Sequence, residues 1–108
     1  MTTTFDQRER AFETKFALDE ELRFKSTARR NRLLGLWAAR KLGVGGADAE
    51  AYARELVTVD VDNPGSDSVF EKVRADFARR DIAAPDDQIR RVMEEFTMQA
   101  LAEIGAGK

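Results

Sequence analysis

The stretch RRNRLLGLWAARKLGVGG, residues 29–46, decides the fold. Its middle part, residues 33–42, is apolar on nearly all sides when it is wound into a helix. A helix that is apolar all round is expected to be surrounded by other elements. The glycines of residues 43–46 end this helix, and Arg40 and Lys41 stand favourably in its last turn. The stretch therefore predicts the C-terminal end of a helix that lies wedged among other helices.

The rest of the chain also has the helical period, and no alternating strand pattern of useful length occurs. From Phe5 to Leu42 there is no proline, and the residues are mostly good helix formers, which favours one long first helix. Asn63 and its neighbours are of residue types typical of turns, so we expect a loop there. Ser68 and Glu71 have the spacing of a capping box, and Pro85 suits the first turn of a last helix.

We therefore predict an all-α, four-helix bundle-like domain over residues 20–105. Its helices are expected at about residues 20–42, 47–61, 69–80 and 85–104. The predicted core includes Trp37, Phe70, Phe77 and Phe96, together with apolar faces on the three later helices. On the first helix, the residues expected to serve the core are Leu18, Leu22, Leu33 and Leu36.

A second apolar stripe lies at the N-terminus, in TTTFDQRERAFETKF, residues 2–16. Phe5, Phe12 and Phe16 fall within roughly 40° of one another on an ideal helix, and roughly 115° from the leucine face. Burying three phenylalanines stabilises by about 5–9 kcal/mol at best. Ordering some 15 residues costs more, at about 1–2 kcal/mol each.

Residues 1–19 are therefore expected to be frayed, or disordered, until a groove on a partner supplies the missing contacts. A different reading stays open at this point. In it, the first helix bends or breaks near Leu18, and the phenylalanines fold back on the bundle.

The composition excludes most catalytic chemistry. The chain has no Cys and no His, hence no disulfide, thiolate nucleophile, zinc cluster or imidazole base. Adjacent carboxylates such as Asp86 and Asp87 point apart on a helix, so they form neither an acid–base dyad nor a metal cage. We expect no enzyme, no metal and no cofactor. Weak nucleotide binding stays open, but the residues specify no site for it.

The net charge of −2 hides a basic block. Residues 22–42 contain seven basic side chains and no acidic one, whereas both flanks are acidic. Three interpretations remain open: a solvated or internally paired face, contact with an acidic loop of a partner, and a small nucleotide- or nucleic-acid-binding protein acting through the face from Arg29 to Arg32. The residues in question are Lys25, Arg29, Arg30 and Arg32.

Two segments resemble a known family. FDQRERAFETKF, residues 5–16, and RRNRLLGLWAA, residues 29–39, with the glycine-rich stop, look like the zeta subunit, the ATPase inhibitor of certain bacterial F-type ATP synthases. The similarity extends through AEAYA, residues 49–53, and VFEKV, residues 69–73. The N-terminal segment also resembles the inhibitory segment of the mitochondrial ATPase inhibitor. The matching positions there are Phe5, Arg8, Glu9, Ala11 and Glu13.

The resemblance implies an inhibitor of ATP hydrolysis whose N-terminal segment forms a helix between catalytic and non-catalytic subunits of the enzyme head. It implies the alpha, beta and gamma subunits as partners, and a block of rotation in the hydrolysis direction. The residues expected to bind are Phe5, Arg8, Glu9, Phe12, Glu13, Lys15 and Phe16. The chain start lacks the features of a signal peptide and no apolar run suits a membrane span, so we expect a cytoplasmic protein without membrane insertion. We also expect a monomer that binds no specific nucleic acid.

Overall fold

The computed structural model describes the backbone of residues 3–106 and the side chains of residues 19–105. The helices are α1, Thr3–Lys41, α2, Gly46–Asp62, α3, Ser68–Arg79, and α4, Asp86–Ala106. Within the described backbone every element is a helix, so the prediction of an all-α fold with four helices is confirmed. The last three helices begin and end within two residues of the predicted positions.

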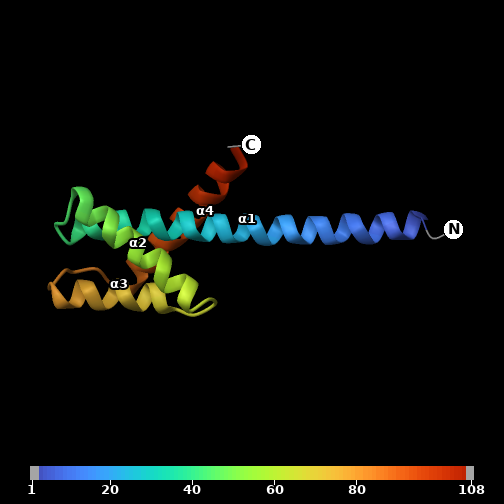
Figure 1. The fold of residues 1–108 in the computed structure, drawn as a ribbon. Coiled ribbons are helices and arrows are strands. Elements are labelled where there is room, and N and C mark those ends of the chain that lie inside the picture. Colours follow the sequence, from blue (N-terminus) through green and yellow to red (C-terminus); the bar gives the residue numbers. More distant parts are fainter. Residues whose placement is uncertain (1–2, 107–108) are drawn as a thin grey trace.

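The first helix is the axis of the fold. Helices α2, α3 and α4 gather around its C-terminal half, and its N-terminal half extends beyond them (Figure 1). At 1.5 Å per residue, the 39 residues of α1 span about 58 Å. One helix therefore belongs to two parts of the molecule, the helical body and the segment in front of it.

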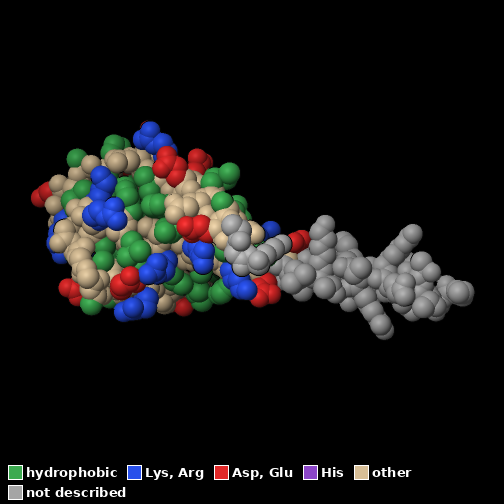
Figure 2. Space-filling model, turned by 90° about the horizontal axis from the view of Figure 1, so that it is seen from above, with side chains coloured by type: hydrophobic (Ala, Val, Ile, Leu, Met, Phe, Trp, Pro, Cys, Tyr) green, Lys and Arg blue, Asp and Glu red, His purple; other side chains and the backbone are tan. Residues whose placement is uncertain are grey.

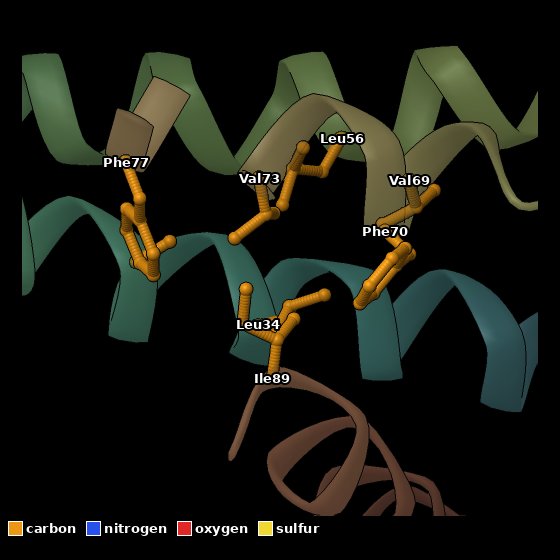
Figure 3. Packing of buried hydrophobic residues seen from close by; sticks show 8 residues of the cluster. Leu34, Leu56, Val69, Phe70, Val73, Phe77 and Ile89 are labelled. Atoms are coloured by element: carbon orange, nitrogen blue, oxygen red, sulfur yellow. The ribbon is translucent and has the colours of Figure 1, made fainter. Parts of the chain in front are cut away.

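The core lies between the C-terminal half of α1 and the three later helices. Side chains of α3 point toward α1 from one side, and Ile89 of α4 meets Leu34 from another (Figure 3). Leu34, Leu56, Val73 and Ile89 have no exposed surface. The remaining buried members of the cluster are Ala38, Val69, Phe70 and Phe77. The predicted core aromatics Phe70 and Phe77 are buried, whereas Trp37 and Phe96 are half-buried and pack against the cluster.

The predicted leucine face of α1 is only partly correct. Leu33 and Leu36 are half-buried, Leu22 is 37% exposed, and the Leu18 side chain lies outside the described residues. The fully buried positions of α1 include Ala38 and Ala39. A search for large apolar side chains overlooks such positions, because small residues are buried where two helices approach closely.

The closest approach is between Gly35 of α1 and Ala53 of α2. A Cβ atom added at Gly35 would lie 2.5 Å from the Cα atom of Ala53 and 3.1 Å from its Cβ atom. Glycine in the middle of a helix is unfavourable by itself. Here it lets the two helix backbones pack at a distance that any side chain would prevent.

The helix ends show one agreement and one correction. Gly43, with φ of 78°, follows α1, and the N–H groups of Gly43 and Val44 donate to the carbonyls of Arg40 and Ala39, at 3.1 and 2.8 Å. This is a Schellman pattern, and the first helix ends at the glycines as predicted. The predicted capping box at Ser68 is wrong. The N-cap of α3 is Asp67, and Ser68 is already helical, with its hydroxyl 2.6 Å from that of Ser66.

Candidate functional site

The predicted partner-binding residues lie on the N-terminal half of α1. They are Phe5, Arg8, Glu9, Phe12, Glu13, Lys15 and Phe16, and their side chains lie outside the described residues. Their backbone is helical and continues through Leu18 into the body without interruption. The structure therefore does not have the break near Leu18 that would fold this segment back on the bundle. That the segment orders only on binding stays a prediction.

The basic run beside this segment is largely paired within the body. Lys25 contacts Glu21 at 3.0 Å, one turn earlier on α1. Arg29 reaches Glu103 of α4 at 3.6 Å, and an Nη atom of Arg32 donates to both oxygens of Glu50 on α2, at 2.9 and 3.0 Å. In the view of Figure 2, basic and acidic side chains lie close together on the surface of the body. The interpretation of an internally paired face therefore holds for these three residues.

Arg30 differs from its neighbours. It is half-buried, and its Nε atom donates to Oδ1 of Asn31 at 2.7 Å. Asn31 is completely buried, and its Nδ2 atom has no hydrogen-bond partner. Burial lowers the pKa of Arg30, and the charge of Asp60 opposes that shift. No described carboxylate lies within 4.0 Å of this guanidinium, so its positive charge is partly desolvated without an ion pair.

A second polar cluster joins α2 to α3 on the body. The hydroxyl of Tyr52 donates to Oδ2 of Asp76 at 2.7 Å, and Lys72 donates to the same oxygen at 3.1 Å. Arg79 also contacts Asp76, and the Lys72 ammonium lies 5.3 Å from the centre of the Tyr52 ring. Burial, with the hydrogen bond to Asp76, raises the pKa of Tyr52 well above its ordinary value. Every charged member has a partner, which indicates a structural tie between helices.

The described residues offer little for other kinds of site. Among them, no three side chains of the kinds that bind metals come together. A membrane-spanning helix is likewise absent from the part of the chain that the structure describes, because no helix there combines the length and the apolar character.

Comparison with known proteins decides the family. A family model described as "ATPase inhibitor subunit zeta" matches residues 1–103, which is nearly the whole chain. The chain belongs to this family. The match includes both the N-terminal segment and the helical body. The zeta-family resemblance in the sequence is thereby confirmed, and with it the role of an ATPase inhibitor subunit.

A solved structure supports the fold of this zeta-family chain. A protein described only as "Solution NMR structure of the protein" is 36% identical and has a TM-score of 0.70. The similarity covers 81% of this chain and 99% of the other. No match is found among curated proteins.

Three features of this zeta-family chain were missed in the sequence. The exposed Phe24, 63% accessible, lies just where α1 enters the body. The buried Asn31 stands within a run of arginines, whose charge suggests an exposed face. The third feature, the contact between Gly35 and Ala53, could have been found in the sequence, because a lone glycine inside a helix-forming, leucine-rich run indicates a close approach. The exposure of Phe24 and the burial of Asn31 depend on which helices surround α1, which the sequence does not show.

Asp76 should stabilise the zeta-family body in a pH-dependent way. Burial opposes ionisation of this carboxyl, but hydrogen bonds from Tyr52 and Lys72 outweigh it and lower the pKa of Asp76. The stabilisation is therefore complete above the ordinary aspartate pKa of about 4 and is lost as pH falls through the lowered value. We expect Asp76→Asn to reduce the free energy of unfolding by about 1–2 kcal/mol at neutral pH.

Urea unfolding at pH 7 and pH 3 measures this effect, and the difference between Asp76→Asn and the parent should shrink at pH 3. Asp62→Asn, at the exposed end of α2, is the matched control and should change stability by less than about 0.5 kcal/mol. A constant difference at both pH values would contradict the role given to the Asp76 charge.

Proposed function

We propose that this protein inhibits ATP hydrolysis by an F-type ATP synthase by inserting residues 1–19 as a helix between a catalytic and a non-catalytic subunit of the enzyme head. The inserted helix blocks rotation in the hydrolysis direction. The body stays outside and limits how far the helix enters. The partners are the alpha, beta and gamma subunits, at the cytoplasmic face of the inner membrane.

The observation that carries this proposal is the continuity of α1. Its C-terminal half is enclosed by the other helices, and its N-terminal half extends past them (Figure 1). A helix built in this way presents its free half from a fixed base, which suits insertion into a groove of a partner. Membership of the zeta family supports the inhibitory role.

The side chains of the segment have distinct roles in the proposal. Phe5, Phe12 and Phe16 fill apolar pockets in the subunit interface. The charged residues Arg8, Glu9, Glu13 and Lys15 pair with groups of opposite charge and set the register of the helix. Such pairs contribute more to selectivity and to the rate of encounter than to affinity. A mechanism of this kind needs no cofactor and no catalytic group of its own.

The rival proposal, a nucleotide- or nucleic-acid-binding face from Arg29 to Arg32, receives less support. Arg29 and Arg32 each have a carboxylate partner on another helix. Phosphate binding at these two residues would have to compete with Glu103 and Glu50. We therefore propose no nucleic-acid partner, and a monomer for the free protein.

A synthetic peptide of residues 1–19 tests the proposed function. It should slow ATP turnover by the isolated enzyme head, because the proposed inhibitory contacts all lie within it. The control is a peptide of the same composition in scrambled order, which should have no effect at the same concentration. Equal effects of the two peptides, or none from either, would argue against insertion of this segment.

A further inference from the structure

A groove of about 590 Å³ lies at the end of the body from which the N-terminal half of α1 extends. One wall is a stripe of α1, and the other comes from the end of α2 and the loop before α3. Phe24, at its edge, is 63% exposed and is the most exposed aromatic side chain among the described residues. Its lining includes Arg23, Phe24, Thr27 and Arg30 on α1, with Asp60 and residues 64–66 opposite.

Three positions of the α1 wall continue the face of the N-terminal stripe, whereas Phe24, at roughly 240° on an ideal helical wheel, stands beside that face. At about 100° per residue, positions 5, 12 and 16 of an ideal helix lie at roughly 120–160°. Positions 23, 27 and 30 lie at roughly 120–180° on the same wheel. Since α1 is one helix from Thr3 to Lys41, a partner that covers the stripe meets this groove next along the same face.

Arg30 is the residue of the groove that determines which ligand it can bind. Its Nε atom is held by the buried Asn31, at 2.7 Å, while its Nη atoms have no hydrogen-bond partner among the described residues. Glu20, Arg23 and Asp60 also line the groove, and neither of the two carboxylates comes within 4.0 Å of Arg30. A half-buried guanidinium with free donors is well suited to a carboxylate, which it can bind through two parallel hydrogen bonds.

The other basic residues of the run do not share this property. Lys25, Arg29 and Arg32 are each within 4.0 Å of a carboxylate of this chain. Of the four basic residues that the sequence offered as a secondary contact, Arg30 alone lacks a carboxylate partner in the part of the chain that the structure describes.

We propose that this groove is a second docking point for the ATPase head, in addition to the inserted segment. It accepts a surface loop that places a carboxylate against Arg30 and an apolar side chain against Phe24. The inference rests on the proposed function, because it takes the enzyme head as the partner. It assigns to the body a specific contact that holds the protein on the enzyme once the segment has entered.

The test compares two arginine variants of the full-length protein, Arg30→Gln and Arg29→Gln, in binding to the isolated enzyme head. Both remove one charge from adjacent positions of α1. Arg30→Gln should raise the Kd on the order of tenfold or more, mainly through faster dissociation, and should reduce the salt dependence of binding. Arg29→Gln, which loses only an exposed ion pair, should stay within about twofold. Equal Kd values for the two variants would overturn the proposal.

A cross-linking experiment is independent of any effect of Arg30 on folding. The chain has no cysteine, so Thr27→Cys creates a single attachment point inside the groove for a benzophenone label. Ala75→Cys, on the exposed side of α3, is the control. Illumination of the complex should cross-link the label at position 27 to a subunit of the head much more efficiently than the label at position 75. Equal or absent cross-linking from position 27 would overturn the proposal.

The groove proposal and the proposed function fail on different results. If the 1–19 peptide inhibits the head but neither Arg30→Gln nor the groove label responds, the groove proposal is wrong and the proposed function stands. If the full-length protein does not bind the head, both are wrong.

Discussion

Replacing Phe12 with Ala is expected to weaken inhibition of the enzyme head roughly 30-fold or more, since truncating an interface anchor costs about 2 kcal/mol or more. Phe12 is the central member of the proposed stripe and belongs to the part of α1 in front of the helical body. The melting temperature should change by no more than about 1 °C, because the proposal assigns the Phe12 side chain to the partner and not to the core. ATPase inhibition curves and thermal unfolding measured on the same preparations provide the two values.

Gln7→Ala is the matched control for Phe12→Ala. Position 7 lies roughly opposite the stripe on an ideal helix, and glutamine and alanine are both good helix formers. Gln7→Ala should leave inhibition within about threefold of the parent, as is usual for residues outside the anchors of an interface. If Phe12→Ala lowered stability and inhibition together, the stripe would belong to the folded body, and insertion would be the wrong mechanism.

Gly35→Ala is expected to destabilise the body by about 1–3 kcal/mol net, although the same change in an exposed helix stabilises by about 1 kcal/mol. The sign reverses because the new Cβ atom would lie 2.5 Å from the Cα atom of Ala53. Helices α1 and α2 would have to separate, which disturbs the packing of Leu34 and Leu56. Urea unfolding with a common slope for both proteins measures the change.

Two further variants make the Gly35 result specific. Gly105→Ala, in α4, should be neutral or slightly stabilising, since nothing lies within 4 Å of the added Cβ atom. Ala53→Gly should not rescue Gly35→Ala, because the nearest atom is the backbone Cα of residue 53 and not its side chain. A stabilising effect of Gly35→Ala would mean that the two helices are less closely packed than described.

Much of the fold could be predicted from the sequence because it follows from local rules. The helical period, the glycines after Leu42 and the turn residues around Asn63 mark four helices, and the structure has the last three within two residues of the expected bounds. The apolar faces of α3 and α4 were also predictable, since Val73, Phe77 and Ile89 are large and regularly spaced.

The errors come from tertiary contacts that no local rule contains. Leu22 was predicted to serve the core from its place on the leucine face, yet it is partly exposed, whereas the small Ala39 is fully buried. The capping box failed because α3 begins one residue early, at Ser68, and the side chain of the N-cap residue Asp67 is held by Arg90 with two hydrogen bonds of 3.0 Å.

The candidate site likewise has one part that could be predicted from the sequence and one part that could not. The Phe5, Phe12 and Phe16 stripe is a property of spacing and can be read from the sequence alone. The basic run cannot be interpreted without the structure, because Glu50 and Glu103, which pair with Arg32 and Arg29, are far away along the chain. Only the folded structure shows that Arg30, unlike its neighbours, has no carboxylate partner among the described residues.

The uninterrupted course of α1 also limits how this chain can change in length. Adding one residue between Asp19 and Leu22 turns everything before it by about 100° relative to the body and moves it by about 1.5 Å. These positions are exposed and mostly charged, which normally marks a stretch that tolerates insertions and deletions. Here a single added or missing residue would misalign the two halves of the molecule. In the loop after α3, between residues 80 and 85, the same change would leave that alignment intact.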